Sequence, residues 1–425
     1  MPKKHTLSVA AGKAIRRVTM LKGNGGSALP GLVVEKISPK FTANHLAHLP
    51  FGVIVVVGTN GKTTTTKFIA DSLALLGKKV LTNDTGSNYS RGIASKIIQE
   101  VKTGSKLPHD IAVIELDEIY ATHFIKKIKP NYVLALNVMR DQLDRFGEID
   151  NTAGYIESVI KSAQKGAVIN ADDELLATLN LQSSKISYFG VSQAIRKNFP
   201  TDSELIAIEN SHSAPYNSVE RSVKLQSYDD KEAVFVHNNK RYSRRLQIKG
   251  GYNYQNAAAA AAILLKILPR TSFADIIDAI AKVQPAFGRG EEVIINGKEI
   301  TIRLVKNPGG FQQVLNDHSN NKQVVIAIND NYADGRDVSW LYDVDFKCLR
   351  KSGVEYVTGN RAYDMAVRLK YDEVKAENID RSIEKTIDKL IKNNSTKNII
   401  IYATYTSMLK IRSILKNSTQ IGGPL

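Results

Sequence analysis

Cysteine is almost missing from this sequence, which has 425 residues and a single cysteine, Cys348. One cysteine excludes an intramolecular disulfide and any zinc site built from several cysteines, and it agrees with a reducing compartment. Long apolar runs are missing as well, because no window approaches the roughly 20 uninterrupted apolar residues that a membrane-spanning helix needs. No signal-peptide core follows the first five residues. We therefore expect a cytoplasmic protein.

Acidic residues are few relative to basic ones: 42 Asp and Glu stand against 58 Lys and Arg, a formal net charge of +16. This balance suits a polyanionic partner, such as nucleic acid, nucleotide phosphates or an anionic membrane surface, without choosing among them. Residues 1–40 and 241–245 are locally basic, and either a solvated surface or attraction to a lipid pyrophosphate would explain them. Nucleic-acid binding is not expected, because no aromatic motif is interleaved with the basic residues.

Short apolar runs dominate the first half of the chain. Continuous β-branched runs of this length are typical of strands buried on both faces of a parallel sheet. Residues 62–76 carry helical spacing between the first two runs, which makes a strand–helix–strand unit. The sequence therefore predicts an α/β fold with a doubly wound, mainly parallel sheet. The expected strands are 53–58, 79–82, 111–116, 132–136 and 167–170.

The second half changes character twice. Residues 190–245 are polar and predict a small β-rich insertion or an extended loop, and helical sequence resumes at 256–268. A hairpin around Asn296-Gly297 predicts the hinge into a second, Rossmann-like α/β domain. That domain has expected strands at 324–328, 355–357 and 399–403 and a helix at 362–370. We predict a basic segment at 1–48, a central domain at 49–297 and a C-terminal domain at 298–425.

A glycine-rich turn joins the first predicted strand to the first predicted helix. Its glycines permit a tight turn and close approach of phosphate, while backbone N–H groups at a helix N-terminus attract anions. Lys62 is expected to neutralise the β and γ oxygens of a nucleoside triphosphate, and the Thr63 hydroxyl to ligate Mg²⁺. The residues of this turn are Gly58, Thr59, Asn60, Gly61, Lys62, Thr63 and Thr64.

The turn departs from the generic phosphate-binding pattern at Val56, where that pattern has glycine. Gly-Thr-Asn-Gly-Lys-Thr-Thr instead resembles the Mur ligases and the folylpolyglutamate synthases. Further segments resemble the MurT family of the Mur ligase superfamily, and they cover most of the chain in the family's order. These segments are 83–88, 114–118, 140–148, 170–173, 250–257, 287–289, 306–311, 329–340, 358–362 and 405–409.

The resemblance implies a carbon–nitrogen ligase of peptidoglycan biosynthesis that uses ATP and Mg²⁺. MurT proteins amidate the α-carboxylate of D-glutamate in the lipid II stem peptide, through an acyl phosphate, to D-isoglutamine. Their ammonia comes from a glutamine amidotransferase subunit, GatD, so we expect a heterodimer acting at the inner face of the cytoplasmic membrane. Many MurT proteins carry a four-cysteine zinc ribbon in the insertion; residues 190–245 contain no cysteine, so zinc is predicted absent.

Polar residues after other predicted strands are expected to share the nucleotide crevice, since ligands of open parallel sheets gather at the carboxyl ends of strands. Glu115 is expected to ligate Mg²⁺ directly or through water, with a structural ion pair as the alternative. Asn137 and Asp141 follow the strand 132–136, and helix capping is the alternative for both. Three further nucleotide contacts are implied by the resemblance: Asn83, Asn256 and Arg289.

Asp337 is the candidate catalytic residue of the second domain, beside Lys62 and Glu115 in the first. The resemblance implies that it reaches the partner subunit and orients the catalytic histidine of GatD. An aspartate that accepts an imidazole N–H holds the correct tautomer and stabilises the imidazolium. The alternatives are a local pair with Arg336 or a cap on the segment that contains Trp340.

Two other functions remain open at this point. A folylpolyglutamate synthase or an amino-acid-adding Mur ligase would use the same nucleotide motifs, although the C-terminal segments argue against both. A non-catalytic nucleotide-binding subunit would keep Lys62 and fail to turn over ATP.

Overall fold

The computed structural model of the chain describes most of its residues. Two compact units divide the chain: one holds residues up to 139, 149–197 and 214–284, and the other holds 140–148, 198–213 and 285–425. The described residues are 3–21, 29–83, 90–102, 106–140, 149–179, 181, 185–206, 219–229, 231–284, 292–316, 318, 321–393 and 397–418.

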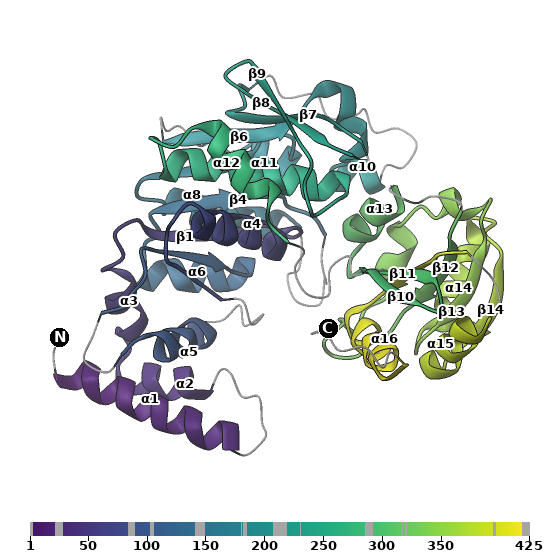
Figure 1. Cartoon of the computed structure of the whole chain (residues 1–425), viewed down its shortest axis with the longest axis horizontal. Coiled ribbons are helices and arrows are strands. Elements are labelled where there is room, and N and C mark those ends of the chain that lie inside the picture. The colour runs from purple at the N-terminus through teal and green to yellow at the C-terminus, as the bar shows by residue number, and fades with distance from the viewer. Residues whose placement is uncertain are drawn as a thin grey trace. The chain divides into compact units, whose positions relative to one another are not determined.

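The first unit is built on a nine-stranded sheet with the order β2-β3-β1-β4-β5-β6-β7-β8-β9 (Figure 1). Strands β1 to β7 pair in parallel, and β8 and β9 continue the sheet in antiparallel pairing. The doubly wound, mainly parallel sheet predicted from the sequence is confirmed. The strands are β1 (Gly52–Val57), β2 (Val80–Thr82), β3 (Ile111–Glu115), β4 (Tyr132–Ala135), β5 (Gly166–Asn170), β6 (Ile186–Val191), β7 (Val223–Tyr228), β8 (Ala233–His237) and β9 (Lys240–Arg244).

Helices cover both faces of this sheet, which explains why its strands are apolar throughout. All six residues of β1 are buried, as a strand between two helical layers requires. One layer contains α4 (Lys62–Leu75), α11 (Gly251–Ile267) and α12 (Phe273–Ala281), which pack on one another. The helices α5 (Ser90–Glu100), α6 (Glu118–Lys127) and α8 (Ile149–Lys161) pack over the other face.

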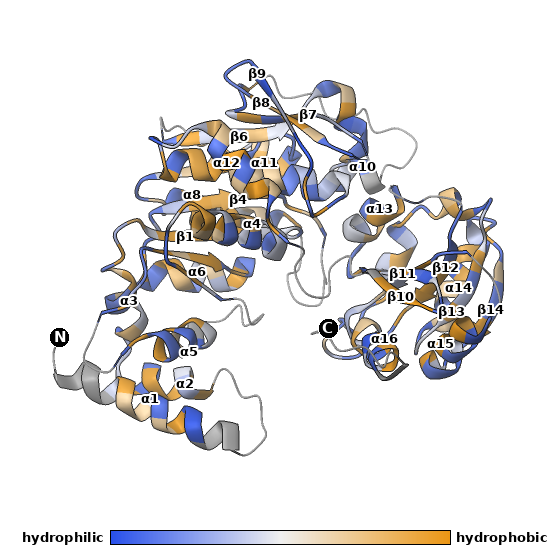
Figure 2. Ribbon diagram, viewed as in Figure 1, coloured by the Kyte–Doolittle hydropathy of each residue, from blue (hydrophilic) through white to orange (hydrophobic). Residues whose placement is uncertain are grey.

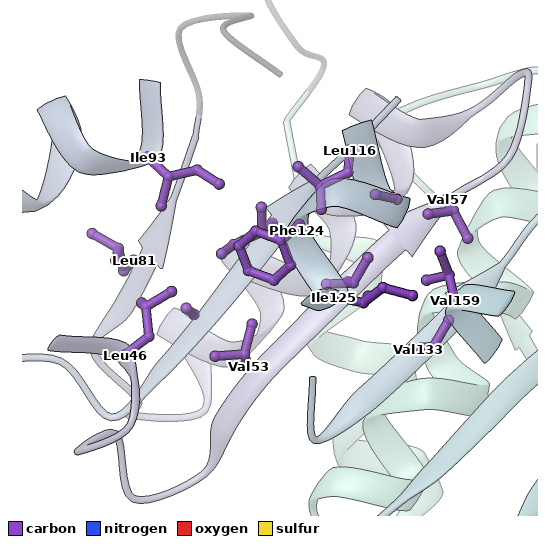
Figure 3. Packing of buried hydrophobic residues seen from close by; sticks show 14 of the residues in the cluster. Leu46, Val53, Val57, Leu81, Ile93, Leu116, Phe124, Ile125, Val133 and Val159 are labelled. Atoms are coloured by element: carbon purple, nitrogen blue, oxygen red, sulfur yellow. The ribbon is translucent and has the colours of Figure 1, made fainter. Parts of the chain in front are cut away.

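The core under α5, α6 and α8 takes alternate residues of the strands. Val53 and Val57 of β1 and Val133 of β4 point into it, and Phe124 of α6 and Val159 of α8 meet them there (Figure 3). Side chains on alternate positions of a strand face the same side of the sheet, so this face is continuous from strand to strand. The packing fixes α6, whose first turn lies at the candidate site described below.

The sequence marks the first 48 residues only as basic, and the described part of this segment contains three helices. They are α1 (Lys3–Leu21), α2 (Leu29–Ile37) and α3 (Phe41–Leu46). Helix α2 packs on α1 and on α5, and the buried side chains Val9, Val34, Phe41 and Leu46 join the core under α5. Gly31 allows the close approach, since an added Cβ would lie 2.0 Å from the Arg91 carbonyl oxygen.

Residues 190–245 are not an extended loop where the structure describes them. Strands β7, β8 and β9 extend the main sheet, so this region is β-rich but continuous with the central fold. Polar sequence is compatible with strands here because the alternate residues Val223, Leu225, Ala233 and Phe235 are buried and the intervening residues are partly exposed. Three short helices lie nearby in the sequence: α9 (Glu174–Ala177), η1 (Gln193–Asn198) and α10 (Asp202–Ile206).

The second unit contains a six-stranded sheet with the order β10-β11-β15-β12-β13-β14 (Figure 1). Its strands pair in parallel except for the β10–β11 hairpin, whose turn residues Asn296 and Gly297 both have positive φ, 51° and 76°. The α/β class predicted for this region is confirmed. The strands are β10 (Glu292–Ile295), β11 (Lys298–Leu304), β12 (Gln323–Ala327), β13 (Val354–Thr358), β14 (Ala376–Asp380) and β15 (Ile399–Ala403).

Each face of the second sheet has its own core. The strands and helices of this unit carry both apolar and polar residues (Figure 2). Val324 and Ile326 of β12 face one core, whereas Val325 and Ala327 face the other. Helices that bury one stripe cover each face. They are α13 (Pro308–Asn316), η2 (Ser339–Asp343), η3 (Lys347–Leu349), α14 (Ala362–Tyr371), α15 (Ile383–Lys392) and α16 (Tyr405–Ser418). No helix in the described part of the chain is both long enough and apolar enough to cross a membrane.

Candidate functional site

The glycine-rich turn lies at the carboxyl end of β1 and leads directly into α4. Strand β1 has β3 on one side and β4 on the other, so the turn sits where the winding of the sheet reverses direction. Ligands of open α/β sheets bind at such switch points. Gly61 precedes α4 with φ 84° and no side-chain cap, which leaves the first N–H groups of the helix directed at the turn. The turn therefore has the geometry of an anion-binding concavity.

The segment that follows β4 is hydrogen-bonded to the turn. Asn137 accepts a hydrogen bond from the Asn60 backbone N–H at 2.8 Å and donates one to the Asn60 carbonyl at 3.0 Å. The Thr59 hydroxyl donates to the Met139 carbonyl at 3.1 Å and accepts from the Met139 N–H at 3.0 Å. Asn137 thus lies at the crevice as predicted, but these contacts assign its side chain to shaping the loop.

Gly58 and Gly61 of the turn have no room for a side chain, because other atoms lie close to the backbone. A Cβ on Gly58, whose φ is 132°, would lie 2.9 Å from the Asn137 backbone nitrogen. A Cβ on Gly61 would lie 2.5 Å from Asn256 Oδ1. Asn256 belongs to the second turn of α11, so the structure brings this predicted nucleotide contact against the phosphate turn.

Replacing Gly61 by alanine is expected to weaken nucleotide binding by at least about tenfold, because the methyl group displaces Asn256 and the backbone is strained by roughly 1–2 kcal/mol. Gly77→Ala is a matched control, since Gly77 has φ 81° and no atom within 4 Å of an added Cβ. Thermal unfolding and ADP titration of both variants separate the two effects. Equal ADP affinity in both variants would contradict a special role for the Gly61–Asn256 contact.

An acidic side chain faces the turn from the end of β3. Glu115 Oε1 accepts the Thr63 hydroxyl at 2.9 Å, and the Glu115 backbone is held at both N–H and carbonyl by the Asn83 side chain, at 2.9 and 2.8 Å. Glu115 makes no ion pair with any residue that the structure describes. A buried carboxylate needs a cation or several hydrogen-bond donors, and metal ligation by Glu115 stays a prediction.

Lys62 has a buried acidic neighbour, Glu118, which is not among the site residues predicted from the sequence. Its ammonium group contacts the Gly58 carbonyl at 2.6 Å, the Thr59 carbonyl at 3.3 Å and Glu118 Oε1 at 3.5 Å. Burial raises the pKa of Glu118 to about 7, and the charge of Lys62 opposes that rise. Glu118 lies in the segment 114–118, but nothing in that segment alone places it beside a lysine of another helix.

The candidate residues that the structure describes in the first unit meet at the carboxyl ends of β1, β3 and β4. Asp141 and Arg289 lie outside the described residues, so their roles stay predictions. The residues brought together are Gly58, Thr59, Asn60, Gly61, Lys62, Thr63, Thr64, Asn83, Glu115, Asn137 and Asn256.

Asp337 belongs to the second unit and lies in the loop between β12 and η2. Its Oδ1 accepts the Ser339 backbone N–H at 2.8 Å, so the suggested cap on the Trp340 segment is present as a local turn. Its Oδ2 has no hydrogen-bond partner within the described ranges, and no pair with Arg336 forms there. Asp334 anchors the same loop by accepting the Thr406 N–H at 2.7 Å. The loop is therefore fixed, and one carboxylate oxygen of Asp337 remains available to a partner.

Comparison with known proteins now identifies the family. The family model of the Mur ligase middle domain matches residues 56–264, and that of the MurT ligase C-terminal domain matches residues 304–408. The MurT subunit of lipid II isoglutaminyl synthase (glutamine-hydrolyzing) from Streptococcus pneumoniae is 32% identical over 450 residues, which cover 97% of each chain. The chain belongs to the MurT family. The MurT subunit of the same name from Staphylococcus aureus is 29% identical, covering 96% of this chain and 97% of its own.

Solved structures of Mur ligases that are not MurT proteins have the same fold as this chain. MurF from Acinetobacter baumannii has a TM-score of 0.67 and 16% identity, over 92% of this chain and 80% of its own. MurF from Thermotoga maritima, solved in complex with ADP, has a TM-score of 0.67 and 17% identity, over 90% of this chain and 83% of its own. These likenesses confirm the predicted Mur ligase fold.

Proposed function

We propose that this chain is the ATP-dependent subunit of an enzyme that amidates lipid II, converting the α-carboxylate of D-glutamate in the stem peptide to D-isoglutamine. The main support for this proposal is that one chain contains both the phosphate turn and a C-terminal domain of the MurT type. The proposal is supported by the relatives named above, which match the chain over nearly its whole length.

The chemistry requires a better leaving group than hydroxide. An oxygen of the substrate carboxylate attacks the γ phosphorus of ATP, ADP leaves, and an acyl phosphate forms. The nitrogen of ammonia then attacks the acyl carbon, the bond from that carbon to the phosphate oxygen breaks, inorganic phosphate leaves, and the nitrogen loses a proton. Lys62 would bind and stabilise charge on the transferred phosphoryl group, a mainly electrostatic contribution.

Thr63 and Glu115 fit a magnesium ion. Their oxygens lie 2.9 Å apart at the phosphate turn, and hydroxyl and carboxylate oxygens are the hard ligands that Mg²⁺ accepts, with nucleotide phosphates and water completing its shell. When bound, Mg²⁺ supplies neutralisation of phosphate charge. Asn83 keeps the Glu115 backbone in place, Asn137 keeps the turn in shape, and Asn256 lies against Gly61 of the turn.

Ammonia must come from elsewhere, because the chain has one cysteine and that thiol is a poor nucleophile. Partial burial raises the pKa of Cys348 to about 11, so its thiolate is scarce at neutral pH. We propose a GatD-type glutaminase subunit as the source, in a heterodimer in which Asp337 accepts the imidazole N–H of the partner's catalytic histidine. Lipid II as substrate places the reaction at the inner face of the cytoplasmic membrane.

Mass spectrometry of lipid II tests the function. Lipid II, ATP, Mg²⁺ and the protein are incubated with ammonium, or with glutamine and a candidate amidotransferase. The expected product carries NH₂ in place of one OH, formed together with ADP. A mass increase by an amino acid would instead indicate an amino-acid-adding ligase. Bound ATP without turnover from either nitrogen source would indicate a non-catalytic subunit and refute the proposal.

A further inference from the structure

A buried carboxylate that belongs to neither the phosphate turn nor the magnesium ligands lies beside the turn. Glu118 is the first residue of α6, directly after the N-cap Asp117, whose side chain accepts the Glu118 N–H at 3.0 Å. Only 3% of Glu118 is exposed, and its charged partner across the fold is Lys62 of α4. The α8 face that packs on α6 is apolar, with Ile156 and Val159 in the shared core. Helix α6, which carries Glu118 at its start, is therefore held in place by apolar packing.

Lys62 is drawn back over the turn by these contacts. Its ammonium group lies on the carbonyl oxygens of Gly58 and Thr59, at 2.6 and 3.3 Å, with the Glu118 carboxylate at 3.5 Å on the same group. The lysine of such a turn reaches the β and γ phosphates when a nucleotide is bound. Lys62 must therefore exchange some or all of these partners for phosphate oxygens.

This exchange of partners would leave the buried carboxylate of Glu118 without the positive charge that stabilises it. A buried carboxylate is costly unless it is paired, and phosphate oxygens would take over the charge of Lys62 that compensates it. The carboxylate would also lie close to the negative phosphates, where like charges repel in a poorly screened interior. Both effects lower the affinity of the site for nucleotide, and both arise from the charge of Glu118 rather than from its size.

We propose that Glu118 is a positioning residue that competes with nucleotide phosphates for Lys62, holding the lysine over the turn when no nucleotide is bound and promoting release of ADP. This inference rests on the proposed function only in taking the turn to bind nucleotide. It concerns the exchange of nucleotide, whichever carboxylate the enzyme activates.

The test is calorimetric titration of the full chain with ADP and Mg²⁺, comparing the protein with its Glu118→Gln variant. Glutamine keeps the size of the side chain and removes its charge, so ADP is expected to bind on the order of tenfold more tightly. With amidation substrates, KM for ATP and kcat are expected to fall together, because tighter ADP binding slows release. A residue that only supports the fold would give weaker binding instead.

Glu174→Gln is the matched control, because Glu174 likewise follows an aspartate N-cap, Asp173, at the first position of α9. Its ADP affinity is expected to equal that of the unmodified protein. A second variant, Glu118→Ala, also removes the charge and is expected to bind ADP more tightly. Unchanged or weaker ADP binding in folded Glu118→Gln, or no ADP binding by the unmodified protein, overturns the proposal. Tight ADP binding without lipid II amidation would refute the proposed function and leave this inference standing.

Discussion

Lys62→Met is expected to lower ATP-dependent amidation by about 10³-fold with either nitrogen source, because it removes the cation that we propose stabilises charge on the transferred phosphoryl group. Methionine keeps most of the volume of a lysine that is only 9% exposed, so the turn should still fold. The measurement is the steady-state rate of ADP formation with lipid II, supplied with ammonium and, separately, with glutamine and the amidotransferase.

Lys67→Met is the control for this experiment. Lys67 lies on the same helix α4, but its ammonium group pairs with Asp71 at 2.7 Å, away from the turn. A half-buried pair near the surface contributes little, so activity is expected to stay within about twofold. If Lys62→Met kept more than about a tenth of the activity while folded, electrostatic stabilisation by this lysine would not be the main contribution of the turn.

The equal loss with both nitrogen sources follows from the order of events. In the proposed mechanism, phosphorylation of the carboxylate precedes attack by ammonia, so a defect in phosphoryl transfer does not depend on where ammonia comes from. This common loss is what separates residues of the phosphate turn from residues that act on glutamine.

The main strands could be predicted from the sequence because each is a short run of β-branched residues. Residues 53–58 predict β1 (Gly52–Val57), and residues 399–403 predict β15 (Ile399–Ala403) without a shift. Burial on both faces leaves no polar positions in such runs, so the pattern is strong even without alternation. The ends are less certain, since a strand ends where backbone pairing ends rather than where apolar residues end.

The start of α11 was predicted too late in the chain. The sequence places it at Asn256, whereas the helix begins at Gly251, after Gly250 with φ 104°. Two adjacent glycines suggest a loop, because glycine is a poor helix former. Packing of α11 on α4 overrides that preference, and Asn256 consequently faces Gly61 from within the helix.

The site was predictable in part. Glu115 ends strand β3 and Asn137 follows strand β4, and the rule that ligands gather at strand ends predicts both at the crevice. Glu118 was missed because an acidic residue after an aspartate N-cap is already explained by the helix dipole. Its contact with Lys62 joins residues that lie 56 positions apart, and only the packing of α6 and α4 around β1 and β3 creates it.

Asp337→Asn is expected to lower glutamine-driven amidation by about 10³-fold while ammonia-driven amidation is retained. Asparagine can still accept the Ser339 N–H through Oδ1, so the local turn persists and the loop stays anchored by Asp334. What is lost is the negative charge on the oxygen that no described residue binds. A histidine that needs this charge to hold its tautomer and to stabilise its protonated form would fail as a general base.

The control is Asp345→Asn, because Asp345 forms the same local turn by accepting the Lys347 N–H at 2.8 Å. Asp345 lies outside the loop that carries Asp337, so both activities are expected to be unchanged. The measurement is the ratio of amide formed from glutamine to amide formed from ammonium, with glutamate release recorded in parallel. Equal loss with both nitrogen sources would mean that Asp337 supports the fold of the second unit and has no selective role in the use of glutamine. A selective loss, with glutamate release falling in step, would require the carboxylate itself to act on the glutaminase histidine.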